Sequence, residues 1–125
     1  MTEELRLLLL DHATGKTYWT PPAQWYVAYF LAGAEVSGGS YARQPIDFAD
    51  AAASTATVSR AGSFDSQTFE NLPATDVDEI RIVDTASGTP GVTGWRIPHL
   101  QSFSAGDDFG YTPNKIGVGI SGFAG

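Results

Sequence analysis

The chain has 125 residues, of which 42% are hydrophobic and 17% are charged, and this composition favours a folded domain over a disordered segment. Seven basic residues against fourteen acidic residues give a net charge of −7, which argues against a protein that binds nucleic acid. The chain has no cysteine, so disulfides and cysteine-ligated metal sites are excluded.

The N-terminal segment predicts a helix over residues 3–14. Thr2 is a suitable N-cap, and the two glutamates that follow it place negative charge where the helix dipole favours it. Leucines at i, i+3 and i+4 form one apolar stripe, and Gly15 is a suitable residue to end the helix. A strand over residues 5–10 is the alternative, because so short a leucine run fits either structure. The same run is too short for a membrane span or a signal peptide.

The rest of the chain predicts strands and turns. Fourteen glycines and seven prolines interrupt it roughly every eight to twelve residues, the spacing expected of a β-sandwich or barrel. The segments with a strand pattern are 24–32, 43–49, 55–60, 65–71, 77–84, 94–102 and 115–121. These observations predict a mainly β, single-domain protein over residues 1–125, namely a β-sandwich of jelly-roll or immunoglobulin-like type with one short N-terminal α-helix.

The segment 20–48 carries the most distinctive sequence. After two consecutive prolines, a continuous apolar and aromatic run from Trp25 to Leu31 predicts a core strand. Gly38 and Gly39 follow, and glycine allows the positive φ that a tight turn between two strands requires. We therefore expect this turn to depend on both glycines.

Tyr41 and Arg43 come directly after the turn, and two interpretations of these side chains are open. Arg43 can pair with Glu35 across the turn, or with a carboxylate of a neighbouring subunit. In the first interpretation, Tyr41 and Arg43 buttress the turn within one chain. In the second, an acidic chain with few bases places its arginines at subunit contacts, and Arg96 is the other candidate for such a contact.

Four segments of the chain share their order and pattern with a known family. They are the prolines before the strand 26–30, the turn from Glu35 to Gln44, the strand and turn 77–88, and the late turn 103–107. In this order they resemble the motifs of the small tail-fibre-like and head-decoration structural proteins of tailed bacteriophages.

The resemblance implies a non-enzymatic structural protein of a phage virion, either a capsid decoration or minor capsid protein or a tail-associated protein. It implies repeated copies, because virion shells and tails are symmetric assemblies. The expected partners are copies of the chain itself and the major capsid or tail proteins of the particle, with no nucleic acid, membrane or cofactor. The expected location is the virion, after synthesis in the host cytoplasm.

The sequence motifs that would indicate catalysis are incomplete or absent. Residues 15–17 resemble the end of a phosphate-binding loop, but Leu10 stands where the first glycine is required and the residues that follow cannot open a helix. The chain has no Gly-x-Ser-x-Gly sequence that would identify a serine nucleophile. His12 and His99 lack metal-ligand spacing, so each is expected to be a surface or hydrogen-bonded histidine.

Two groups of acidic residues raise the question of calcium binding. Asp76, Asp78 and Glu79 form one group, and Asp107 and Asp108 form the other. Both lack the glycine and the distal glutamate of an EF-hand loop. Solvated charge at strand ends is the preferred interpretation, and a calcium site at a subunit junction is the alternative.

The tryptophans suggest another function, that of a receptor- or glycan-binding tail-fibre module. Trp19, Trp25 and Trp95 could stack on sugars, although tryptophans in a β core more often serve packing. A hydrolase with a dispersed site is a third hypothesis, and no residues can be named for it.

Overall fold

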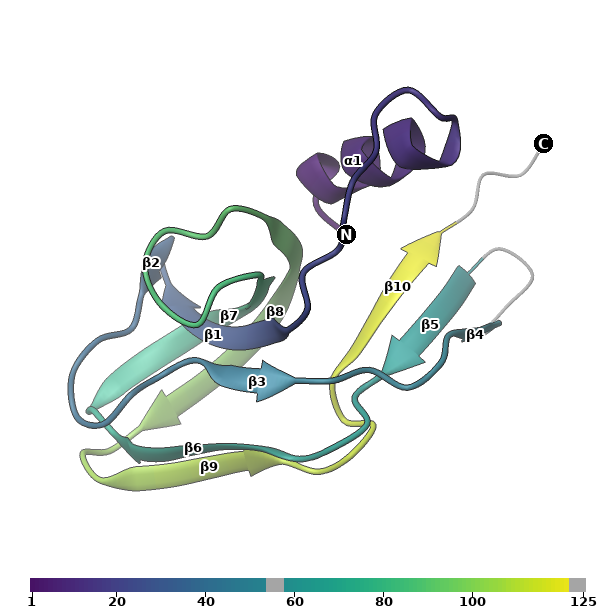
Figure 1. The fold of residues 1–125 in the computed structure, drawn as a ribbon. Coiled ribbons are helices and arrows are strands. Elements are labelled where there is room, and N and C mark those ends of the chain that lie inside the picture. The colour runs from purple at the N-terminus through teal and green to yellow at the C-terminus, as the bar shows by residue number, and fades with distance from the viewer. Residues whose placement is uncertain (54–57, 122–125) are drawn as a thin grey trace.

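The computed structural model describes residues 1–53 and 58–121, and Figure 1 shows their arrangement. The single helix in these ranges is not long and apolar enough to cross a membrane. The elements are α1 (Glu3–Ala13), β1 (Trp25–Leu31), β2 (Ala34–Glu35), β3 (Gln44–Ile46), β4 (Ala52–Ala53), β5 (Val58–Gly62), β6 (Gln67–Leu72), β7 (Thr75–Val83), β8 (Thr93–Phe103), β9 (Asp107–Tyr111) and β10 (Gly117–Ser121).

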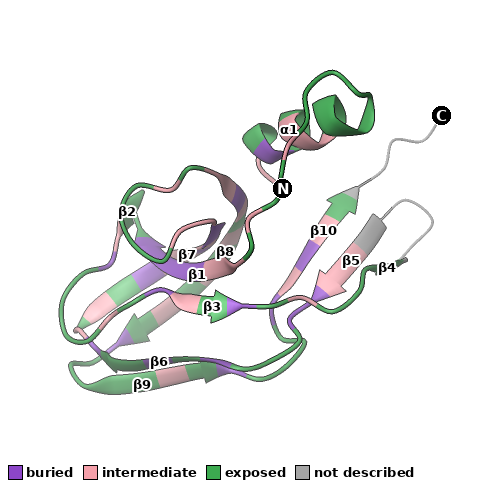
Figure 2. Ribbon diagram, viewed as in Figure 1, coloured by how far each residue is buried: buried purple, intermediate pink, exposed green. Residues whose placement is uncertain are grey.

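Helix α1 occupies the predicted segment. The Thr2 hydroxyl accepts a hydrogen bond from the Leu5 backbone N–H at 3.2 Å, which caps the first turn. Gly15 follows the last turn with a φ of +75°, a conformation common after helix ends. Leu5 is buried while most of the helix is exposed, as Figure 2 shows, so α1 packs through one narrow stripe. The strand alternative for residues 5–10 is wrong.

The largest sheet has the order β2-β1-β7-β8, and β3 also pairs with β1. Strand β2 pairs with the C-terminal end of β1, and β3 pairs with its N-terminal end. The two short strands therefore form one interrupted edge along β1, and residues 36–43 leave the sheet between them. The predicted turn does join two strands, but they are successive parts of one sheet edge and not a hairpin.

Two smaller sheets, β10-β5-β4 and the pair β6-β9, share one hydrophobic core with the largest sheet. The core surrounds Tyr29 of β1, whose side chain is fully buried. Its ring stacks on Phe69 of β6 with the ring centroids 4.2 Å apart. Apolar side chains of β7, β9 and β10 complete the core. The chain is thus a mainly β sandwich with one short N-terminal helix, as predicted.

The opposite face of the largest sheet carries a second, smaller buried cluster, formed by Ala28, Phe30 and Val83. The guanidinium of Arg81 lies over the Phe30 ring, 4.0 Å from its centroid. The β7–β8 loop, residues 84–92, curves past β1 and β2 in Figure 1. This path brings the loop to the interrupted edge of the sheet.

Every predicted strand overlaps an observed strand, with shifts at the ends. Residues 55–57 of one predicted strand lie outside the described residues. Strands β2, β4 and β9 were not predicted. β2 and β4 have two residues each, too few for a periodic pattern, and β9 begins with two aspartates, which are depleted in strands.

Candidate functional site

Three side chains of the turn, Glu35, Tyr41 and Arg43, form a partly buried, hydrogen-bonded cluster. Glu35 ends β2, and Arg43 lies directly before β3. Nε and Nη2 of Arg43 donate to the two carboxylate oxygens of Glu35 at 2.8 and 2.9 Å. Such a two-point ion pair fixes the relative orientation of both side chains. The pairing within the chain, one of the two alternatives for Arg43, is present.

Arg43 also binds the β7–β8 loop. Its Nη1 donates to the backbone oxygen and to Oγ1 of Thr85, both at 2.9 Å, and its Nη2 donates to the backbone oxygen of Gly88 at 2.7 Å. Together with the bonds to Glu35, these contacts give an acceptor to each of the five N–H groups of the guanidinium. Arg43 is only 8% exposed, and all of these acceptors belong to its own chain. These contacts agree with the interpretation that Arg43 buttresses the turn.

Tyr41 occupies the gap in the interrupted sheet edge. Its hydroxyl accepts a hydrogen bond from the Tyr29 backbone N–H at 3.0 Å and donates one to Oε2 of Glu35 at 2.9 Å. The hydroxyl thus supplies the acceptor that a neighbouring strand would otherwise give to the Tyr29 N–H. Leaving this N–H buried and unpaired would cost about 1–3 kcal/mol of stability. Burial raises the pKa of Tyr41 despite the opposing bond from Tyr29, so the hydroxyl remains a donor.

We call these groups the Glu35–Arg43 cluster, formed by Glu35, Tyr41 and Arg43 with Thr85 and Gly88 of the loop. Partial burial acts to raise the pKa of Glu35, but the hydrogen bonds from Arg43 and Tyr41 lower it by more, so this pKa lies below its ordinary value of 4.5. The bond to Glu35 raises the pKa of Arg43. The cluster is therefore an ion pair at neutral pH, with its donors already engaged.

The two glycines of the turn adopt positive φ, as predicted. The φ of Gly38 is +107° and that of Gly39 is +55°. A Cβ on Gly39 would lie 2.4 Å from the backbone oxygen of Asn71, and this oxygen accepts a hydrogen bond from the Ser40 N–H at 2.8 Å. The turn therefore lies directly against β6, which leaves no space for a side chain at Gly39.

Arg96 lies apart from the cluster. It is on β8, where its Nε donates to both carboxylate oxygens of Glu79 at 3.1 and 3.2 Å. Its side chain is 55% exposed. The structure thus brings together the five predicted site residues of the turn but not Arg96, whose assignment to a subunit contact stays a prediction.

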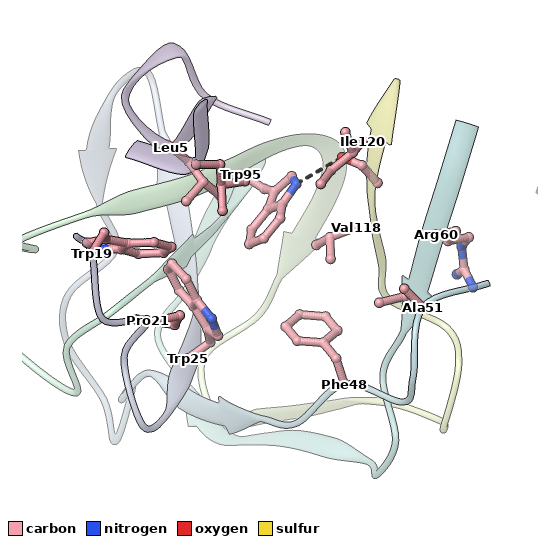
Figure 3. A pocket seen from close by; sticks show the side chains of 13 residues that line it. Leu5, Trp19, Pro21, Trp25, Phe48, Ala51, Arg60, Trp95, Val118 and Ile120 are labelled. Carbon is pink, nitrogen blue, oxygen red and sulfur yellow. Dashed lines mark hydrogen bonds between the residues drawn. The ribbon is translucent and has the colours of Figure 1, made fainter. Parts of the chain in front are cut away.

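A second candidate site is an open apolar groove between α1, the largest sheet and β10. The volume of the groove is about 300 Å³. We call it the tryptophan groove because all three tryptophans of the chain line it, as Figure 3 shows. The side chains used below are those of Leu5, Trp19, Trp25, Phe48, Trp95 and Ile120.

Contacts within the protein hold the walls of the groove. Trp25 of β1 and Trp95 of β8 meet edge to face, with ring centroids 5.6 Å apart. Nε1 of Trp95 donates to the backbone oxygen of Gly119 at 3.3 Å, which ties β8 to β10. The backbone N–H of Trp19, on the segment after α1, donates to Nδ1 of His12 at 3.2 Å. The three indoles therefore surround a preformed space.

The walls of the groove are apolar. Apart from the indole N–H groups, Arg60 carries the polar side chain among the described lining residues, and its Nη1 donates to Oδ1 of Asn114 at 2.8 Å. In Figure 3 Arg60 lies at the margin, away from the indoles. A glycan site needs placed polar groups beside its aromatic faces, whereas the centre of a protein contact does not. Trp25 and Trp95 also pack against the core, as predicted.

Both histidines are hydrogen-bonded, as predicted. Nε2 of His99 lies 3.0 Å from the Tyr111 hydroxyl, which lies 2.7 Å from the Tyr29 hydroxyl. Burial lowers the pKa of His99, and burial raises the pKa of Tyr111 to about 12. This chain of groups is therefore uncharged at neutral pH. Residues 15–17 follow α1 and do not open a helix, so their likeness to a phosphate-binding loop is accidental.

The acidic residues of both groups accept hydrogen bonds within the protein, but Asp78 and Glu79 lie inside β7, so their expected place at a strand end is wrong. Asp78, Asp107 and Asp108 each accept one from a backbone N–H, and Asp76 accepts one from the Ser102 hydroxyl. Across residues 1–53 and 58–121, no three side chains of histidine, cysteine, aspartate or glutamate are grouped so that they could hold a metal ion. A calcium site at a subunit junction stays a prediction.

The sequence matches a family model described as Podophage GP4 fiber I protein gp80. The match covers residues 1–118 and so includes α1, the interrupted sheet edge and most of the residues that line the tryptophan groove. No curated protein and no solved structure matches the chain.

Proposed function

The chain belongs to the family of podophage GP4 fiber I protein gp80, and from this premise we propose that it is a non-enzymatic structural subunit of the virion that attaches to tail or capsid proteins. It is made in the host cytoplasm and is present in repeated copies. A subunit of this kind needs a stable fold and a surface for its neighbours. The tryptophan groove is the observation that supports such a surface.

The groove has the properties of a protein contact site. Contiguous exposed apolar surface is uncommon on proteins that work alone, and tryptophan is enriched among the residues that dominate contact energies. Ile120 at the groove is 50% exposed. The three indoles line the same open space. These side chains favour a role in which another protein covers this part of the molecule.

A receptor- or glycan-binding fibre module is the alternative, because the three indoles gather in one place. Sugars stack on indoles but also require hydrogen bonds to their hydroxyl groups. The apolar walls therefore favour a protein partner, and a glycan array with the isolated protein tests the alternative directly.

The experiment compares two variants in purified particles of the phage that encodes the chain. Trp19→Ala removes one wall of the groove, and Tyr18→Ala is the matched control, because Tyr18 is 82% exposed and does not line the groove. Mass spectrometry gives the copies per particle. We expect Trp19→Ala to lower this number severalfold and Tyr18→Ala to leave it unchanged. Equal incorporation of both variants and the unaltered protein would contradict the proposal.

A further inference from the structure

Resting on this structural role, we propose that the tryptophan groove binds a short apolar segment of a different virion protein, with lysine or arginine residues beside its apolar side chains. A second copy of this chain is the competing occupant. The size of the groove, its fixed walls and the charged residues near it together favour the first.

The groove has the size of a peptide anchor. Its open space is about 300 Å³. An enclosed apolar cavity of about 150 Å³ accepts a benzene molecule, so the groove has room for about two large apolar side chains. A short segment that inserts one or two such side chains fits this space.

The walls are set before binding. A Cβ on Gly94 would lie 3.1 Å from the Trp25 ring and 3.2 Å from the Leu5 side chain, so β8 lies directly against both. The edge-to-face contact of Trp25 with Trp95 further restricts both indoles. A preformed site loses little conformational entropy when it binds, and a small contact can then be selective.

Among the described residues, the charged ones that line the groove or adjoin its lining residues include three carboxylates without an ion-pair partner and one lining arginine, Arg60. Glu4, Asp47 and Asp50 are exposed, and each is adjacent in sequence to a residue that lines the groove. Within the described part of the chain, none of the three forms an ion pair with a lysine or arginine. Arg6 and Arg96, which adjoin lining residues, are paired with glutamates of this chain, and the guanidinium of Arg60 is hydrogen-bonded to Asn114. Positive charge on the occupant would therefore meet carboxylates that have no cationic partner.

A second copy of the chain is poorly suited to these carboxylates. The chain carries a net charge of −7. Arg6, Arg43, Arg81 and Arg96, four of its seven bases, already pair with its own carboxylates. A second copy would thus bring mainly negative charge close to the carboxylates near the groove. At physiological salt, charges closer than about 8–10 Å are not fully screened, so the two copies would repel each other. Complementary charge selects partners and speeds association, so a basic segment is favoured.

Tryptophan fluorescence reports directly on this site, because every tryptophan of the chain lines the groove. The probes are two synthetic peptides with the same central phenylalanine–leucine pair, one flanked by lysines and the other by glutamates. We expect the lysine peptide to bind at least tenfold more tightly at low salt, and its advantage to shrink as salt rises. Trp19→Ala should weaken binding, Tyr18→Ala should not, and Asp50→Asn should reduce the preference for lysine.

Equal affinity for the two peptides, or no binding of either, would overturn the inference. A dimer that sedimentation detects in the unaltered protein and not in Trp19→Ala would also overturn it, because the occupant would then be a second copy. These outcomes are separate from the structural role itself. That role stands if Trp19→Ala still lowers the copies per particle, and it fails if incorporation is normal.

Discussion

The Glu35–Arg43 cluster and the tryptophan groove differ in both chemistry and availability. In the cluster, each N–H of the Arg43 guanidinium meets an acceptor of the same chain, and the side chain is buried. In the groove, apolar side chains from α1, β1, β8 and β10 border an open space. The most distinctive sequence motif therefore stabilises the fold, while the available surface comes from residues scattered along the chain.

The physical cause lies in the directionality of the two kinds of interaction. Hydrogen bonds need particular donors and acceptors at fixed angles, so a polar cluster requires particular residues at fixed positions and leaves a recognisable motif. The hydrophobic effect has no direction and scales with area, so a groove wall requires only apolar residues of suitable size. A contact surface of the second kind leaves no compact signature in the sequence.

The largest expected effect comes from Arg43→Glu. The change removes five donors and places a second carboxylate opposite Glu35. Breaking a buried ion pair in this way costs about 3–5 kcal/mol of the free energy of unfolding. Urea unfolding of the isolated protein measures the loss.

Arg96→Glu is the matched control, because it makes the same charge change at an exposed ion pair. Its expected cost is below about 1 kcal/mol. Equal losses for the two variants would contradict the structural role of the cluster. A stable Arg43→Glu protein that failed to join particles would instead support the interpretation of Arg43 as a subunit contact.

The second prediction concerns the turn that carries the cluster. Gly39→Val combines strain at positive φ with a collision against the backbone oxygen of Asn71, and we expect a loss of roughly 3 kcal/mol. A Cβ at Gly38 would contact only the Pro73 side chain, at 3.4 Å, and a Cβ at Gly15 would contact nothing within 4 Å, so Gly38→Val and Gly15→Val should each lose about 1–2 kcal/mol from φ strain. Denaturant midpoints rank the three. The same midpoint for the Gly39 and Gly15 variants would show that β6 yields to the added side chain.

Local signals predicted the elements whose ends are determined by neighbouring residues. Thr2 and Gly15 mark the helix correctly, because a cap and a left-handed residue act within one turn. The two turn glycines and the Glu35–Arg43 pairing were readable because the residues lie close together in sequence.

Features that depend on strand order were not readable from the sequence. Nothing local to Trp25 or Trp95 indicates that β7 lies between their strands, and this arrangement brings the two indoles together. The interruption of the sheet edge was missed for the same reason, since it depends on β2 and β3 both pairing with β1. The three tryptophans were the available signal for the groove, and their sequence positions did not show that they meet.

The smallest expected effect tests the electrostatic part of the cluster by acid. The pKa of Glu35 in the folded protein lies below 4.5, so the unfolded chain binds more protons as the pH falls through this range. The stabilisation from Glu35 is therefore complete above about pH 4.5 and is lost as the pH falls through the folded pKa. Glu35→Gln removes this dependence, while Glu79, whose pKa is also lowered, titrates in both proteins and cancels from the difference.

We expect the free energy of unfolding to fall more steeply below about pH 4.5 in the unaltered protein than in Glu35→Gln. The difference should be less than about 1 kcal/mol, because the Glu35 side chain is 30% exposed and solvent screens the pair. Urea unfolding at several pH values measures both slopes. Parallel curves would mean that the charge of Glu35 contributes little to stability. The stabilising part of the cluster would then be the neutral acceptors of the β7–β8 loop, which Arg43 reaches through its remaining donors.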